Sequence, residues 1–122
     1  MKKVLWRARY FQVVFLVFCF VAAGADLTYA SAPTSVNLAY DAGAESLSVT
    51  IDHYTASTGM HRIKIVEIKK NGTSVSKNEY DKQPTDSTFT YTYKIPAAKG
   101  DKFEVTASCN LWGSKTAALT VP

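Results

Sequence analysis

Residues 46–53 read Ser-Leu-Ser-Val-Thr-Ile-Asp-His, and this short stretch decides the fold class. Apolar and polar residues alternate along it without a break, so that Leu47, Val49 and Ile51 fall on one face. A period of two is typical of a β-strand that buries one of its faces. His53 continues the apolar phase, and the pattern therefore predicts that it shares their face of the sheet.

The rest of the chain beyond residue 31 repeats this pattern. Short runs rich in Val, Ile, Thr, Tyr and Phe alternate with turn signals. They predict further strands at residues 36–40, 61–70, 74–80, 88–95, 102–108 and 115–121. Seven short strands without helical periodicity predict an all-β fold, an immunoglobulin-like β-sandwich, with a closed barrel as the alternative.

Two local signals refine this prediction. Asn71-Gly72 separates two of the predicted strands, and this pair is typical of a two-residue hairpin turn in which both residues need positive φ. Within residues 61–70 the apolar phase shifts between Ile65 and Val66. The shift indicates either a β-bulge or a strand that is buried on both faces.

The first thirty residues have the order of a secretory signal peptide. Basic residues come first, an apolar run follows over residues 11–23, and small residues come last. We therefore predict a signal peptide over residues 1–30, cleaved after Ala30 or, as a second choice, after Ala25. An uncleaved anchor is the alternative, although the run is shorter than the ~20 residues of a spanning helix. The domain over residues 31–122 is expected to be exported, to the periplasm or the extracellular space, and to meet a membrane only through an uncleaved segment.

Removing residues 1–30 changes what the charge and the cysteines mean. The whole chain has 14 basic and 10 acidic residues, and the cut leaves 10 and nine, so that the net charge falls from +4 to +1. No basic cluster remains, which excludes nucleic acid as the expected partner. Cys109 becomes the single cysteine of the exported domain and cannot form an internal disulfide.

The chain has only two histidines, His53 and His61, and both flank the loop between the second and third predicted strands. Cys109 ends the sixth. The loop between the second and third strands and the loop between the sixth and seventh strands lie at the same end of an immunoglobulin-like sandwich. All three residues are therefore expected to converge. Two imidazoles and a thiolate suit a transition metal, so a metal ion is the predicted partner. In the alternative interpretation the histidines face water at strand ends and the cysteine is a small core residue.

No Ser/His/Asp set, carboxylate pair or phosphate loop supports hydrolase or nucleotide chemistry.

At residues 109–113, Cys-Asn-Leu-Trp-Gly resembles the Cys-Asn-x-His-Gly motif of superoxide reductases, the iron domain also found in desulfoferrodoxins. Residues 49–68 resemble the strand–His–loop–His–strand of that family. The resemblance implies an immunoglobulin-like sandwich that holds one iron through His53, His61 and an axial Cys109. It also implies reduction of superoxide to peroxide with electrons from an external donor.

The chain departs from the family pattern in its ligands. Trp112 stands where the motif has its histidine, the family's early histidine has no counterpart, and Thr58-Gly59-Met60 replaces a loop lysine. The competing prediction is therefore a diverged, non-catalytic binding or interaction domain without iron chemistry. A lesser alternative is copper, because two histidines, one cysteine and a nearby Met60 match the blue-copper ligand types. Trp112 itself is predicted to plug the core, and a loop aromatic that covers the site is the alternative.

Overall fold

The computed structural model describes residues 32–122, and the predicted signal peptide lies outside these residues. The described chain forms seven strands and no helix. They are β1 (Ser35–Asp41), β2 (Ser46–Asp52), β3 (Ile63–Lys70), β4 (Thr73–Glu79), β5 (Thr88–Lys94), β6 (Lys102–Cys109) and β7 (Ser114–Thr120). Within this part of the chain, nothing is helical over a length that could cross a membrane.

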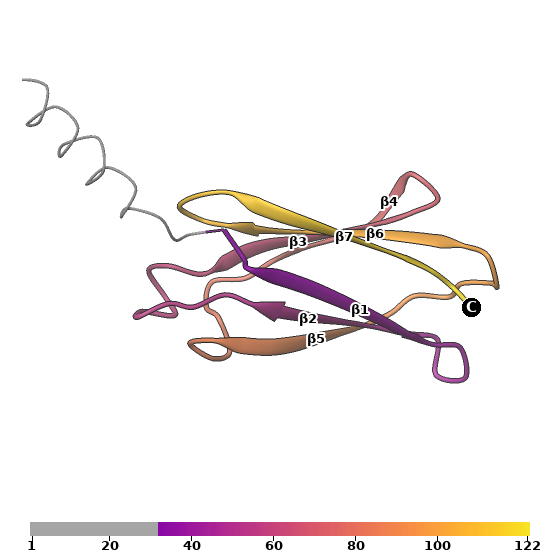
Figure 1. Ribbon diagram of the computed structural model, residues 1–122, viewed down its shortest axis with the longest axis horizontal. Coiled ribbons are helices and arrows are strands. Elements are labelled where there is room, and N and C mark those ends of the chain that lie inside the picture. Colours follow the sequence, from indigo (N-terminus) through magenta and orange to yellow (C-terminus); the bar gives the residue numbers. More distant parts are fainter. Residues whose placement is uncertain (1–31) are drawn as a thin grey trace, which may run out of the picture. The chain divides into compact units, whose positions relative to one another are not determined.

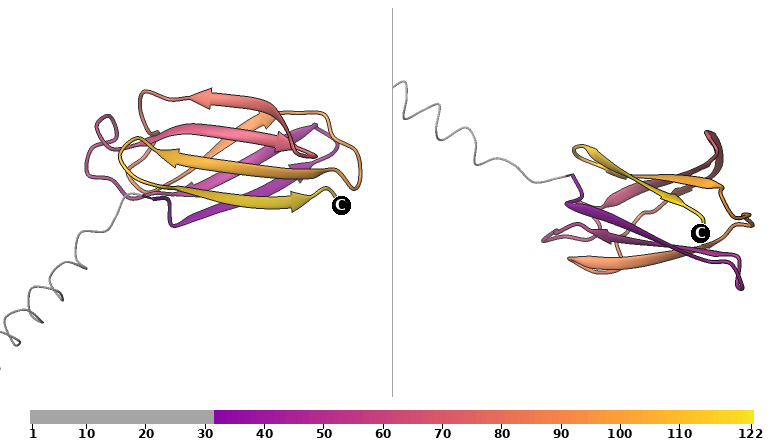
Figure 2. Two further views of the ribbon diagram at one scale, coloured as in Figure 1. Left: turned by 90° about the horizontal axis from the view of Figure 1, so that it is seen from above. Right: turned by 45° about the vertical axis from the view of Figure 1, so that its right-hand side comes forward.

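The strands pack as two antiparallel sheets. One sheet has the order β1-β2-β5 and the other the order β4-β3-β6-β7. Figures 1 and 2 show the two sheets as stacked layers. This arrangement confirms the predicted all-β sandwich, and the predicted strand boundaries agree with the observed ones to within two residues.

The core lies between the two layers and follows the alternation of the sequence. From β2, Leu47, Val49 and Ile51 are fully buried, as the opening stretch predicted. From the opposite sheet, Phe103 and Val105 of β6 are equally buried. Because successive side chains of a strand point to opposite faces, each strand packs one face against this core and turns its other face outward.

A β-bulge lies at the start of β3, and it is one of the two alternatives that the phase shift indicated. Ile63 pairs with Cys109, whereas Ile65 pairs with the preceding residue, Ser108, so β3 carries one extra residue at this point. The bulge lets Ile63 and Val66 both face the core, where both are fully buried. Bulges re-aim the neighbouring backbone, and this one lies directly beside Cys109.

The hairpin from β3 to β4 also follows the prediction. Asn71 and Gly72 have φ values of 52° and 82°, so both occupy the left-handed region that this turn requires. The turn lies at the end of the sandwich opposite to the histidines.

Three loops meet at the other end of the sandwich, on the left in Figure 1. They are residues 53–62 after β2, residues 80–87 after β4 and residues 110–113 after β6. The loop after β4 is tied to the loop after β2 by backbone hydrogen bonds, from His53 N to Ser87 O (2.9 Å) and from Gln83 N to Thr58 O (3.0 Å). The loops after β2 and β6 thus share one end, as predicted.

Candidate metal centre

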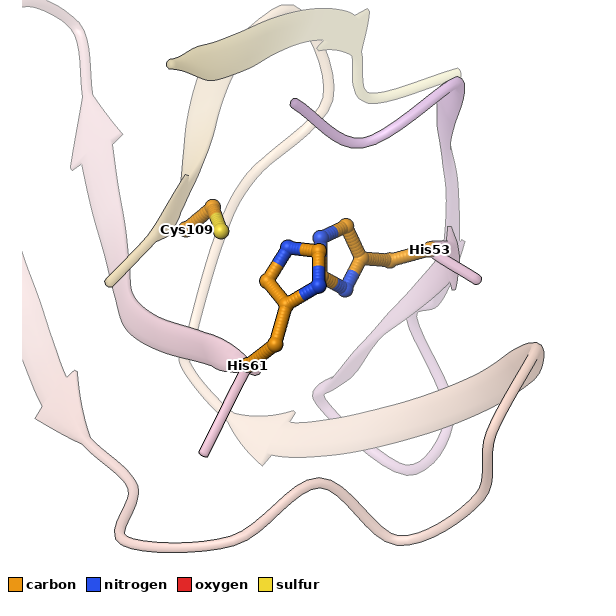
Figure 3. Close-up of side chains that lie close together, drawn as sticks. All are labelled: His53, His61 and Cys109. Carbon is orange, nitrogen blue, oxygen red and sulfur yellow. The ribbon is translucent and has the colours of Figure 1, made fainter. Parts of the chain in front are cut away.

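His53, His61 and Cys109 come together at this end of the sandwich. One potential ligand atom from each residue lies within 4.8 Å of the others. Figure 3 shows both imidazole rings and the Cys109 side chain directed toward one another. The predicted convergence is confirmed, while the binding of a metal remains a prediction.

The two histidines reach the centre from different backbone settings. His53 directly follows β2, keeps the buried phase of that strand and is only 2% exposed. His61 was predicted to begin the third strand, and this is wrong, because β3 begins at Ile63. The His61 N–H instead donates to Ser57 O at 2.9 Å and closes a turn, so it is not available to a strand ladder. The rings meet edge to face, with centroids 4.7 Å apart.

Gln83 supports His53 from behind. It lies in the loop between β4 and β5, is completely buried, and its Oε1 is hydrogen-bonded to Nδ1 of His53 at 2.8 Å. Sequence reasoning missed this residue. Its only local signal is a single amide beside Pro84 in a polar loop, and such residues are common on surfaces.

Asn110 supports His61 and follows Cys109 directly. Its Oδ1 accepts from the backbone N–H of Arg62 at 2.8 Å, and its Nδ2 donates to Met60 O at 2.9 Å. These two backbone groups flank His61 in the chain. The motif contained this asparagine, but only the structure shows that it joins the histidine loop to the cysteine loop.

Two observations bear on how the donor atoms fit a metal ion. First, Nε2 of His61 is buried and has no hydrogen-bond partner among the described residues, an arrangement that is costly unless something else satisfies the nitrogen. Second, a nitrogen and a sulfur bound to one metal lie at most about 4.3 Å apart, the sum of two typical bond lengths. The observed separations of up to 4.8 Å exceed that limit by about 0.5 Å, so the side chains would have to move closer together by that much to share one metal.

Cys109 is a free thiol and half-buried. Its Sγ accepts a hydrogen bond from the backbone N–H of Leu111 at 3.4 Å. Backbone N–H groups of this kind stabilise the negative charge of a thiolate and tune the metal that it binds. The thiol also donates to Oδ1 of Asn110 at 3.8 Å, so the sulfur has hydrogen-bond partners in the loop that follows it.

The loops after β2 and β6 expose large apolar side chains. Four large hydrophobic side chains are exposed on the two ligand-bearing loops: Tyr54, Met60, Leu111 and Trp112. The prediction that Trp112 plugs the core is wrong, because its side chain is 74% exposed. The reason is that the chain leaves β6 at Cys109, so Trp112 lies at the tip of the loop and beyond the core layer.

Sequence comparisons find no match for the chain among protein-family models or curated proteins. Among solved structures, three of the superoxide reductase (neelaredoxin) from Ignicoccus hospitalis are similar in fold, two of them with single substitutions. One covers 73% of this chain and 80% of its own length at 14% identity, with a TM-score of 0.47. A second covers 71% and 77% at the same identity, with a TM-score of 0.48. Similarity at this level assigns no family.

Proposed function

We propose that this protein is an exported metal-binding domain that holds one iron ion through His53, His61 and Cys109. The observation that carries the proposal is the meeting of these three donors within 4.8 Å at one end of the sandwich. The buried Nε2 of His61, without a hydrogen-bond partner in the described chain, supports it.

The donor set defines the class of metal. Imidazole and thiolate suit iron, copper and zinc, whereas calcium and magnesium prefer oxygen. Three protein ligands leave coordination positions open on iron and on zinc, so a small molecule has room to bind there. Iron is the first metal to test, because the Cys109-Asn110 segment resembles the iron motif of superoxide reductases.

The chemistry that bound iron supplies is one-electron transfer. Reduction of superoxide to hydrogen peroxide consumes one electron and two protons, and we propose this as the reaction of the centre. The electron comes from an external donor, because the two cysteines of this sequence are too few to hold an iron–sulfur cluster with four thiolate ligands beside the single iron. The protein's own contribution is to bury His53, to orient His61 and to donate the Leu111 N–H to the thiolate sulfur.

Metal analysis of the anaerobic protein tests the binding step. We expect one equivalent of ferrous iron per chain and, after oxidation, a thiolate-to-iron charge-transfer absorption. Cys109→Ala should abolish that absorption, and His61→Ala should weaken binding. Lys77→Ala changes an exposed residue of β4 and serves as the matched control. Absence of stoichiometric iron, or binding indifferent to Cys109→Ala, would exclude the iron centre.

A second candidate function is a non-catalytic interaction domain, favoured by the exposed apolar side chains on the ligand-bearing loops. A superoxide assay separates the two. Stoichiometric peroxide formation from the iron-loaded protein and a chemical reductant supports the reductase. Bound iron without superoxide consumption supports the interaction domain. A copper site with an axial methionine would use Met60, whose side chain is 78% exposed, and Met60→Leu tests that ligand.

Export is tested on the protein isolated from its native cell. An intact mass that matches a chain starting at Ser31 would support the proposed cleavage after Ala30. Recovery of the full-length chain in the membrane fraction would support the anchor instead.

A further inference from the structure

Gln83 is a buried amide whose hydrogen bonds are all made inside the protein. Its Oε1 is bonded to Nδ1 of His53 at 2.8 Å and accepts from the backbone N–H of Ile63 at 3.1 Å. Its Nε2 donates to the carbonyl oxygens of His53 and Thr85, both at 2.8 Å. Two bonds to the oxygen and two from the nitrogen complete the capacity of a carboxamide group.

These partners leave the amide only one orientation. The backbone N–H of Ile63 is only a donor, and the two carbonyl oxygens are only acceptors. A flipped amide would point its own N–H groups at the Ile63 N–H and its oxygen at both carbonyls, losing all three bonds. The oxygen of Gln83 therefore faces His53.

The orientation of Gln83 in turn fixes the tautomer of His53. Because the amide oxygen only accepts, Nδ1 of His53 must carry the proton and donate it. In the neutral imidazole the lone pair then belongs to Nε2. The nitrogen that could bind a metal is thus chosen by backbone groups of Ile63 and Thr85, acting through one side chain.

We propose that Gln83 is the positioning residue of the metal centre, which presents Nε2 of His53 as the ligand atom before any metal arrives. This inference rests on the metal site proposed above. The same oxygen also holds Ile63, the first residue of β3 and two positions beyond His61. Gln83 therefore ties both histidine-bearing segments to one point.

Nuclear magnetic resonance of the purified protein tests the tautomer without any metal. With 15N-labelled histidine, two imidazole spin systems are expected, and a His61→Asn variant assigns them. We expect the His53 pattern to show the proton on Nδ1. A proton on Nε2 instead would overturn the positioning role, whatever the metal result.

Zinc, which is diamagnetic, then tests the ligand atom. On addition of zinc we expect the Nε2 resonance of His53 to shift while the Nδ1 proton remains. Loss of the Nδ1 proton on zinc binding would contradict the proposal. If zinc and ferrous iron both fail to bind although the tautomer is as expected, the proposed metal centre is overturned, and the role of Gln83 with it.

Two substitutions of Gln83 distinguish a role in orienting His53 from a role in the stability of the fold alone. Gln83→Leu removes the acceptor, and we expect a mixed His53 tautomer and a 10- to 100-fold weaker zinc affinity, the usual range for a lost outer partner of a ligand. Gln83→Glu keeps an acceptor oxygen beside His53, so we expect the proton to stay on Nδ1 as in the unmodified protein. This holds even though the second carboxylate oxygen faces the two carbonyl oxygens to which the amide nitrogen donates. Ile68→Ala changes a fully buried residue of β3 that pairs with Ser76 and Val105, and it controls for lost stability.

The outcomes are distinct even if one variant does not fold. Should Gln83→Leu be insoluble, the wild-type tautomer and Gln83→Glu still decide the proposal. An unchanged tautomer and affinity in folded Gln83→Leu would overturn it. So would an equal loss of zinc affinity in Ile68→Ala, since that would assign the effect to stability alone.

Discussion

Asn110 holds His61 from both sides, because its amide bonds the backbone of Arg62 at 2.8 Å and of Met60 at 2.9 Å. A third bond, from the Asn110 N–H to Arg62 O at 3.0 Å, closes the contact. Since Asn110 adjoins Cys109, its side chain links the cysteine to the loop that carries His61.

This relationship predicts the effect of Asn110→Ala. The substitution leaves the Arg62 N–H and the Met60 carbonyl without their partner, at a cost of about 1–3 kcal/mol in the free energy of unfolding. The His61 loop should also loosen, and iron affinity should fall about 10- to 100-fold. Denaturant unfolding and metal competition measure the two effects. Asn78→Ala is the matched control, because Asn78 bonds Ser76 on β4 and contacts no ligand. Equal iron affinities in the two variants would contradict the coupling.

Metal binding should stabilise the fold. A ligand that binds only the folded state adds about 2.7 kcal/mol at 100 times its dissociation constant. For a domain of this size, each kcal/mol raises the melting temperature by roughly 4–8 °C. We therefore expect an increase of at least about 10 °C with saturating ferrous iron, reversed by a chelator, in anaerobic calorimetry. The Cys109→Ala variant should show little or none of it.

A cluster of tyrosines predicts a pair of opposite substitution effects. The rings of Tyr80 and Tyr91 stack at 4.2 Å, and the hydroxyls of Tyr80 and Tyr93 are 2.6 Å apart. The Tyr91 hydroxyl is buried and, among the described residues, has no hydrogen-bond partner. Tyr91→Phe should therefore be neutral or stabilising by up to about 1 kcal/mol, whereas Tyr93→Phe should cost about 0.5–1.5 kcal/mol. Urea unfolding compares them, and a larger loss in Tyr91→Phe would refute this reading.

The same tyrosines predict alkaline destabilisation. Burial, followed by the neighbouring Tyr80, raises the pKa of Tyr91 to about 12. Burial and the hydrogen bond with Tyr80 raise the pKa of Tyr93 as well. Because an unfolded tyrosine titrates near pH ~10, the unfolded chain releases these protons first. Their contribution to stability is thus complete below pH ~10 and is lost as the pH rises from there through the folded-state values. Unfolding measured across that range should show a steep decline, weaker in Tyr91→Phe.

Trp112 and Phe103 test the division between loop and core. Trp112 is exposed, so Trp112→Ala should change stability by less than about 0.5 kcal/mol. Phe103 is fully buried between the sheets, and Phe103→Ala should cost about 3–5 kcal/mol. Thermal unfolding of the two variants measures this difference, and a Trp112→Ala loss as large as that of Phe103→Ala would argue for a contact that the structure does not show.

Much of this protein could be predicted from local patterns. Alternation over residues 46–53 predicted the strand, its buried face and the orientation of His53. Asn71-Gly72 predicted a turn, and the phase shift in β3 indicated a bulge as one of two alternatives. Strand order then brought His53, His61 and Cys109 to one end, because side-chain periodicity and sandwich topology depend on spacing along the chain.

Only the tertiary structure decided what holds the centre together. Gln83 lies 30 positions from His53, and Asn110 lies 50 from Met60. Their partners are mostly backbone atoms, which every residue type offers alike, so no pattern of side chains marks them in the sequence. The exposure of Trp112 was hidden for a related reason, since an aromatic residue beside a strand can turn inward or outward. The sequence by itself therefore determined which groups could meet, while the packing of three loops determined their distances, their orientation and the tautomer of His53.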